Sequence, residues 1–120
     1  MSPLKDITVI VCGGREYNDR ASVFAVLDRI HDRVGISVVK HGQARGADRL
    51  AGEWAESRGI TVQGFPADWD QFRKRAGILR NIEIAESGAD LCVAFPGGRG
   101  TAHMVSLCKK TGIATIEVPQ

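Results

Sequence analysis

The chain has 120 residues, of which 43% are hydrophobic and 25% charged, and its formal net charge is +2. These values are typical of one globular domain, spanning 1–120, that buries its own core without disulfides. The small net charge argues against nucleic acid as a partner, and the chain has no apolar run near the roughly 20 residues of a membrane span.

Apolar, β-rich runs alternate with stretches of helical periodicity. Strands are expected at 7–12, 36–40, 60–65, 91–95 and 114–118. The four helices between them are expected at 19–34, 47–58, 78–87 and 101–110. Asp19 or its neighbour Asn18 offers the first helix a cap, and Gly35 and Gly59 end the first two helices. A longer connection, 67–77, precedes the third helix.

This alternation predicts an α/β fold with a parallel sheet covered by helices on both faces. The usual solution is a doubly wound, Rossmann-like sheet of five strands in the order 3-2-1-4-5. The connections then diverge between strands 1 and 4, and ligands bind beyond the carboxyl ends of the strands at such a point. The loops 13–15 and 96–101 both fall there.

The loop that follows the fourth strand is the strongest functional signal. A glycine-rich turn before a helix leaves backbone N–H groups unpaired, and the helix dipole adds partial positive charge. The turn is therefore an expected phosphate seat. Its residues are Pro96, Gly97, Gly98, Arg99, Gly100 and Thr101. The loop Gly13-Gly14-Arg15 would complete the cradle, with Arg15 as a phosphate clamp or a solvated side chain.

Other polar residues fall at the same edge of the sheet, each open to two interpretations. His41 is a ligand contact or a hydrogen-bonded structural histidine, and Asp48 is a ligand contact or a cap of its own helix. Trp69 and Phe72 either stack on a base or cover the open end of the sheet. Arg80, placed in the first turn of the third helix, is expected to reach the anion held by the fourth loop.

Several classes of site are disfavoured. There is no Cys-x-x-Cys pair or histidine pair at metal-ligand spacing, so no metal is expected. Walker-type lysine and Gly-x-Gly-x-x-Gly patterns are also missing, which argues against NTP hydrolysis by that route and against ordinary dehydrogenases. Cys12, Cys92 and Cys108 lie in apolar segments and indicate free thiols in a reducing cytosol. The start of the chain shows no signal-peptide pattern, so the cytoplasm is the expected location.

The motifs occur in the order seen in the YspA-like branch of the SLOG superfamily, which the chain resembles over nearly its whole length. The superfamily unites Rossmann-like domains resembling the Lonely Guy enzymes and DNA-processing protein A. The resemblance implies a nucleotide or nucleotide-derived ligand, of the NAD, ADP-ribose or nucleoside monophosphate type, without a required cofactor. Such domains occur in bacteria and phages, and the resemblance implies a homodimer or a higher homo-oligomer. The implied ligand-binding residues are Gly13, Gly14, Arg15, His41, Gly42, Arg45, Gly46, Ala47, Asp48, Arg80, Asn81 and 96–101.

Lonely Guy enzymes cleave a base from ribose 5′-phosphate, and their signature resembles 96–101 followed by an acidic residue. Met104 stands at that acidic position here, and Asn81 replaces a lysine after the matching Arg80. A thioether cannot stabilise a cation-like sugar, so another carboxylate would have to serve, in the order Asp48, Asp68, Glu83.

Three functions follow. A nucleotide-binding domain, acting as a sensor, sequestering protein or signalling module, fits the retained phosphate seat and the missing acid. An N-glycosidic hydrolase, with Arg80 and Asp48 or Asp68 as catalytic residues, is the alternative. Binding of single-stranded DNA is the least favoured because no basic groove with interleaved aromatics extends beyond 69–75.

Overall fold

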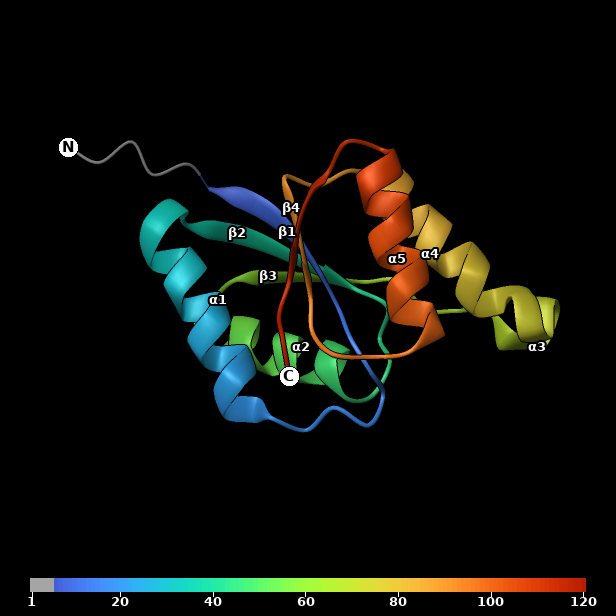
Figure 1. Ribbon diagram of the computed structural model, residues 1–120, viewed down its shortest axis with the longest axis horizontal. Coiled ribbons are helices and arrows are strands. Elements are labelled where there is room, and N and C mark those ends of the chain that lie inside the picture. The colour runs from blue at the N-terminus through green and yellow to red at the C-terminus, as the bar shows by residue number, and fades with distance from the viewer. Residues whose placement is uncertain (1–5) are drawn as a thin grey trace.

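Five parallel strands form one sheet with helices packed on both faces (Figure 1). The computed structural model describes residues 6–120. In chain order the elements are β1 (Ile7–Cys12), α1 (Arg20–Val34), β2 (Ile36–His41), α2 (Ala47–Ser57), β3 (Thr61–Gly64), α3 (Trp69–Phe72), the 3₁₀ helix η1 (Arg73–Arg75), α4 (Ala76–Ser87), β4 (Leu91–Ala94), α5 (Arg99–Lys110) and β5 (Ala114–Glu117).

The strand order is β3-β2-β1-β4-β5, with every pairing parallel, which confirms the predicted sheet. Side chains of the central strand β1 alternate between two cores. Val9 and Val11 pack with residues of α1 and α2 on one face. Ile10 and Cys12 pack with residues of α4 and α5 on the other. The two helix layers thus cover opposite faces of the sheet.

The connection expected at 67–77 is the main difference from the sequence prediction. It contains α3 and η1, and α4 begins at Ala76 rather than at residue 78. Arg80 therefore lies in the second turn of its helix, not the first. The carboxylate of Asp68 accepts the Gln71 N–H at 3.0 Å and caps α3. Such a short helix carries no apolar periodicity, so the sequence pattern did not reveal it.

The three cysteines are free and buried, as predicted, and all belong to the core under α4 and α5. Lys40 is also buried, with 8% of its surface exposed. Its ammonium donates to the Gly88 carbonyl oxygen at 2.7 Å and to the hydroxyl and carbonyl oxygens of Ser87. The lysine therefore fastens β2 to the C-terminus of α4. Within 6–120, none of the helices combines the length and apolarity that crossing a membrane requires.

Three loops meet at the backbone of Gly14. Its N–H donates to the Pro96 carbonyl oxygen at 2.8 Å, and its own carbonyl oxygen accepts the N–H groups of Tyr17 and Ala47, each at 3.2 Å. Gly46 has φ +79°, and a Cβ there would overlap the Gly14 carbonyl oxygen. The loops after β1, β2 and β4 are thereby joined through main-chain contacts that leave no room for side chains.

We expect Gly46→Ala to destabilise the fold by about 1–3 kcal/mol more than Gly59→Ala, measured as free energy of unfolding in urea. Gly59 also has positive φ, +70°, but has nothing within 4 Å of a would-be Cβ. Gly59→Ala therefore reports the conformational cost alone, about 1–2 kcal/mol. Equal losses in the two variants would show that the contact between loops does not matter.

Candidate functional site

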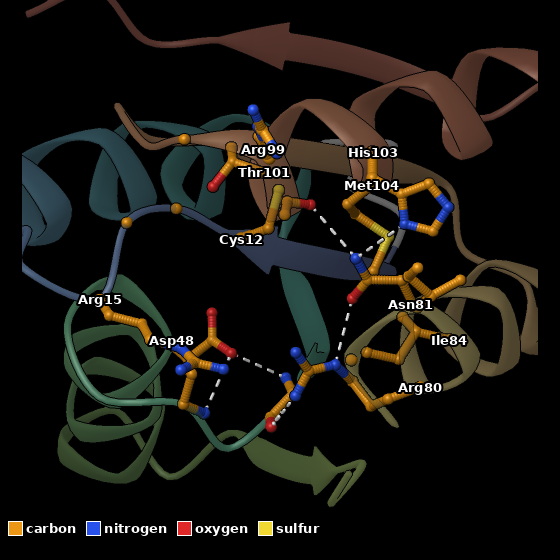
Figure 2. Close-up of a pocket in the computed structure, with 18 of the residues that line it drawn as sticks. Cys12, Arg15, Asp48, Arg80, Asn81, Ile84, Arg99, Thr101, His103 and Met104 are labelled. Carbon is orange, nitrogen blue, oxygen red and sulfur yellow. Dashed lines mark hydrogen bonds between the residues drawn. The ribbon is translucent and has the colours of Figure 1, made fainter. Parts of the chain in front are cut away.

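A pocket of about 600 Å³ opens at the carboxyl ends of β1 and β4 (Figure 2). Its volume lies within the range of small-molecule sites. The loop after β1 and the N-terminus of α5 form one side, and the loop after β2 and α4 form the other. The pocket therefore occupies the switch point that the strand order predicts.

The N-terminus of α5 presents open backbone to this pocket. Gly98 is its N-cap and supplies no side-chain acceptor, so the N–H groups of the first turn have no capping partner. A Cβ at Gly98 or Gly100 would meet nothing within 4 Å. At Gly97, by contrast, a Cβ would lie 2.6 Å from the Gly14 nitrogen. Gly97 in the loop thus allows close packing, whereas Gly98 at the N-cap and Gly100 in the first turn of α5 face open space.

Arg80 and Asn81 connect the two sides of the pocket. The Arg80 guanidinium donates to the Gly42 carbonyl oxygen and, through Nε, to Asn81 Oδ1 at 3.1 Å. Asn81 Nδ2 donates to the Gly100 carbonyl oxygen at 3.2 Å and lies 3.2 Å from His103 Nδ1. Because Oδ1 accepts from Arg80, the amide must donate to His103. His103 Nδ1 is then the acceptor, and its remaining proton is on Nε2.

Asp48 is the buried carboxylate of the pocket, with 6% of its surface exposed. Its Oδ2 accepts the N–H groups of Gly42 at 3.0 Å and Ala44 at 3.2 Å, so it caps the preceding loop rather than its own helix. Burial raises the pKa of Asp48 to about 6, although these two N–H groups and the charges of Arg80 and Arg15 oppose the shift. In Figure 2, Asp48 lies between the two arginines.

Arg80 itself is partly desolvated. Burial is the main reason that its pKa is lowered from the usual value, and the nearby Arg15 adds to the effect. The carboxylate of Asp48 opposes that shift. A guanidinium remains protonated in proteins, so the pocket keeps a poorly hydrated cation that favours an anionic ligand.

The floor of the pocket is apolar and includes Val11, Cys12, Ile84 and Met104. Met104 is 2% exposed and packs in the core under α5. No carboxylate therefore stands where the Lonely Guy signature has its acid. Of the three substitutes considered, only Asp48 lines the pocket, because Asp68 caps α3 and Glu83 is an exposed residue of α4 outside the lining.

Eleven of the predicted ligand-binding residues line the pocket: Gly13, Gly14, Arg15, Gly42, Asp48, Arg80, Asn81, Gly98, Arg99, Gly100 and Thr101. Gly46, Ala47, Pro96 and Gly97 do not, and belong to the backbone junction around Gly14.

His41 and Arg45 line a different hollow beside α2 and β3, and Arg45 also lines a hollow that contains Arg15 and Trp69. His41 Nδ1 accepts the Gln43 N–H at 2.9 Å, as a structural histidine would, and burial, aided by Arg80, lowers its pKa. Arg45 pairs with Glu16 at the surface.

Sequence reasoning missed several lining residues, notably Lys74, Ile78 and His103. His103 lies three residues after Gly100 on α5, so helical spacing was a usable signal. Lys74 and Ile78 reach the pocket through η1 and the early start of α4, which the sequence pattern did not reveal. Within residues 6–120 there is no group of three or more His, Cys, Asp or Glu side chains that could hold a metal ion.

Comparison with known proteins gives three findings. The model of the YspA, cpYpsA-related SLOG family matches residues 7–72. The Gene 61 protein of Mycobacterium phage D29 is 43% identical over 116 residues, covering 90% of this chain and 93% of the phage protein. The crystal structure of the C-terminal domain of the PF1911 hydrogenase from Pyrococcus furiosus has a TM-score of 0.56 at 17% identity, covering 98% of this chain and 96% of that domain. That likeness shows a shared fold alone.

The raised pKa of Asp48 predicts a pH-dependent stability difference. Its pKa is about 6 in the fold against a reference value of 3.8. The proton is thus bound more tightly in the folded state, and Asp48 contributes stability at low pH that is lost as the pH rises through about 6. We expect the free energy of unfolding of Asp48→Asn, measured in urea, to rise by about 2–3 kcal/mol relative to that of wild type when the pH is raised from about 3 to about 7.

The control is Asp48→Ala, which removes the acceptor for Gly42 and Ala44. It should be less stable than Asp48→Asn at every pH. A pH-independent difference between wild type and Asp48→Asn would contradict the raised pKa.

Proposed function

The chain belongs to the YspA, cpYpsA-related SLOG family, and from that premise we propose that it binds a nucleotide or nucleotide-derived ligand in the pocket between β1 and β4. The observation that carries the proposal is the uncapped N-terminus of α5, open at Gly98 and Gly100, facing a pocket that contains Arg80. Ligands of the NAD, ADP-ribose or nucleoside monophosphate type fit this chemistry. The domain would serve as a sensor, sequestering or signalling module, as a monomer or homodimer.

The phosphate is proposed to sit at the first turn of α5. Free N–H groups and the helix dipole favour an anion there. Absence of side chains at Gly98 and Gly100 lets phosphate oxygens approach the main chain. Arg80, Arg15, Arg99 and Lys74 also line the pocket, against the single carboxylate of Asp48. This excess of positive charge supports an anionic ligand.

The sugar is proposed to lie between Asp48 and the apolar floor. Asp48 Oδ2 is occupied by two N–H groups, whereas Oδ1 has no hydrogen-bond partner among residues 6–120. A carboxylate oxygen in this state is a natural acceptor for a ribose hydroxyl. The apolar side chains of Ile84 and Met104 provide the surface against which the ring would pack.

We expect Gly98→Val to abolish binding of AMP, NAD and ADP-ribose in isothermal titration calorimetry, because its side chain would occupy the phosphate seat. Gly98 has φ −105° and open space around it, so the free energy of unfolding should change by only about 0.5 kcal/mol. Ala21→Val, in the exposed first turn of α1, is the matched control and should bind normally. Unchanged affinity in Gly98→Val would refute the seat.

A second candidate function is N-glycosidic hydrolysis, favoured by the raised pKa of Asp48 in the same pocket as Arg80. In this reaction a water oxygen bonds to C1′ of the sugar while the bond from C1′ to the base nitrogen breaks, and the base leaves with a proton. The ionised Asp48 would activate the water or stabilise the cation-like sugar, and Arg80 would hold the phosphate.

If the protein is such a hydrolase, it should release free adenine from AMP, as measured by chromatography. Asp48→Asn should lower the rate by about 10²–10⁴-fold, the usual contribution of a general acid or base. The wild-type rate should fall as the pH drops below about 6, where Asp48 becomes protonated. Binding of AMP without any base release would eliminate this function and leave the binding function standing.

A further inference from the structure

A hollow of about 350 Å³, different from the one that His41 lines, adjoins the main pocket and is called the second hollow below. Four residues line both: Arg15, Gly42, Ala44 and Arg80. The additional walls of the second hollow come from the loops after β2 and β3 and from the start of α3. The two hollows are thus neighbouring compartments that share these residues, and the guanidinium groups of Arg15 and Arg80 line both.

Trp69, the first residue of α3, forms one wall of this second hollow. It is 47% exposed, whereas Trp54 is fully buried and donates its indole N–H to Asp28 at 2.9 Å. The Arg15 guanidinium lies 5.4 Å from the centre of the Trp69 ring, and the edge of that ring faces Gly77. In Figure 1, α3 projects at the end of α4. An indole is therefore held at the mouth of the pocket with much of its surface open.

We propose that Trp69 is the stacking surface for the base of a diphosphate-linked nucleotide. This inference rests on the proposed binding function. The base would lie on Trp69 in the second hollow. The diphosphate would pass between Arg15 and Arg80 to the phosphate seat at the first turn of α5, and the remaining sugar would enter the main pocket. Each phosphate would then have a cation within the shared walls, and the two compartments would hold the two ends of the ligand.

The arrangement of Arg15 supports this assignment. Its side chain is exposed, so its guanidinium is free to turn from the indole to a phosphate and uncover the ring. Base–aromatic stacking is favourable for any base, because every base has a π face. An arginine can donate two parallel hydrogen bonds to one phosphate, and the solvated guanidinium of Arg15 has these donors available. Trp69 would thus contact the base of the nucleotide, and Arg15 would contact its phosphate.

The test compares two probes, ADP-ribose and ribose 5-phosphate; the second lacks the AMP half of the first and therefore has no base to stack on Trp69. Trp69→Ala should weaken ADP-ribose binding by at least about tenfold, within the usual range for loss of a stacked base. It should leave ribose 5-phosphate affinity unchanged. ADP-ribose should quench tryptophan emission in wild type but not in Trp69→Phe, which keeps a stacking ring and most of the affinity. Trp69→Leu, which keeps only apolar bulk, should bind as weakly as Trp69→Ala.

Phe72→Ala is the matched control, because Phe72 lies on the same short helix, is 39% exposed and does not line either hollow. It should bind both probes like wild type. Wild-type affinity for ADP-ribose in Trp69→Ala, with binding still lost in Gly98→Val, would overturn the stacking role and leave the proposed function intact. If wild type binds neither ADP-ribose nor ribose 5-phosphate, both the stacking role of Trp69 and the proposed binding function are overturned. A change of sedimentation in Trp69→Ala and Phe72→Ala alike would assign this surface to a second copy instead.

Discussion

The backbone of Gly14 is the constraint on which the rest of the site depends. Its N–H binds the loop after β4, and its carbonyl oxygen binds the start of α2. These hydrogen bonds join segments that are far apart in the sequence, and they do so at the carboxyl ends of neighbouring strands. The pocket is therefore shaped by main chain rather than by flexible side chains. Main-chain geometry of this kind is preorganised for a ligand that is recognised through backbone N–H groups.

Positively charged side chains outnumber negatively charged ones around the pocket. Cationic groups line the pocket from the loop after β1 and from η1, α4 and α5, while a single carboxylate, Asp48, lies among them and accepts two N–H groups of the loop after β2. Burial and the positive neighbours act on Asp48 in opposite directions, and burial prevails. The floor beneath is apolar, with Met104 in place of an acid. The site combines an anion-binding rim with one titratable group on the wall opposite α5, which is the arrangement that both proposed functions use.

The sequence predicted the fold class, the strand order and most of the pocket lining because these follow from local patterns. Alternating apolar runs set the sheet, and the switch-point rule placed the loops at 13–15 and 96–101 together. Other features depend on contacts between distant segments. Asp48 as a cap of the preceding loop, the exclusion of His41 from the pocket and the contact of Arg80 with Gly42 all require the packed loops. Lys74 and Ile78 enter through η1 and the first turn of α4, whose short elements lack periodicity.

The hydrogen bonds between Lys40 and the end of α4 join the two halves of the chain. Lys40 lies in the first half of the chain, and its acceptors, Ser87 and Gly88, lie in the second. A fragment ending at residue 72, where the match to the family model stops, would retain this ammonium group without those acceptors. It would also lack β4, the neighbour of β1 in the sheet centre. Each half therefore holds groups whose partners lie in the other, so we expect the smallest stable unit to extend past the stretch that the family model matches.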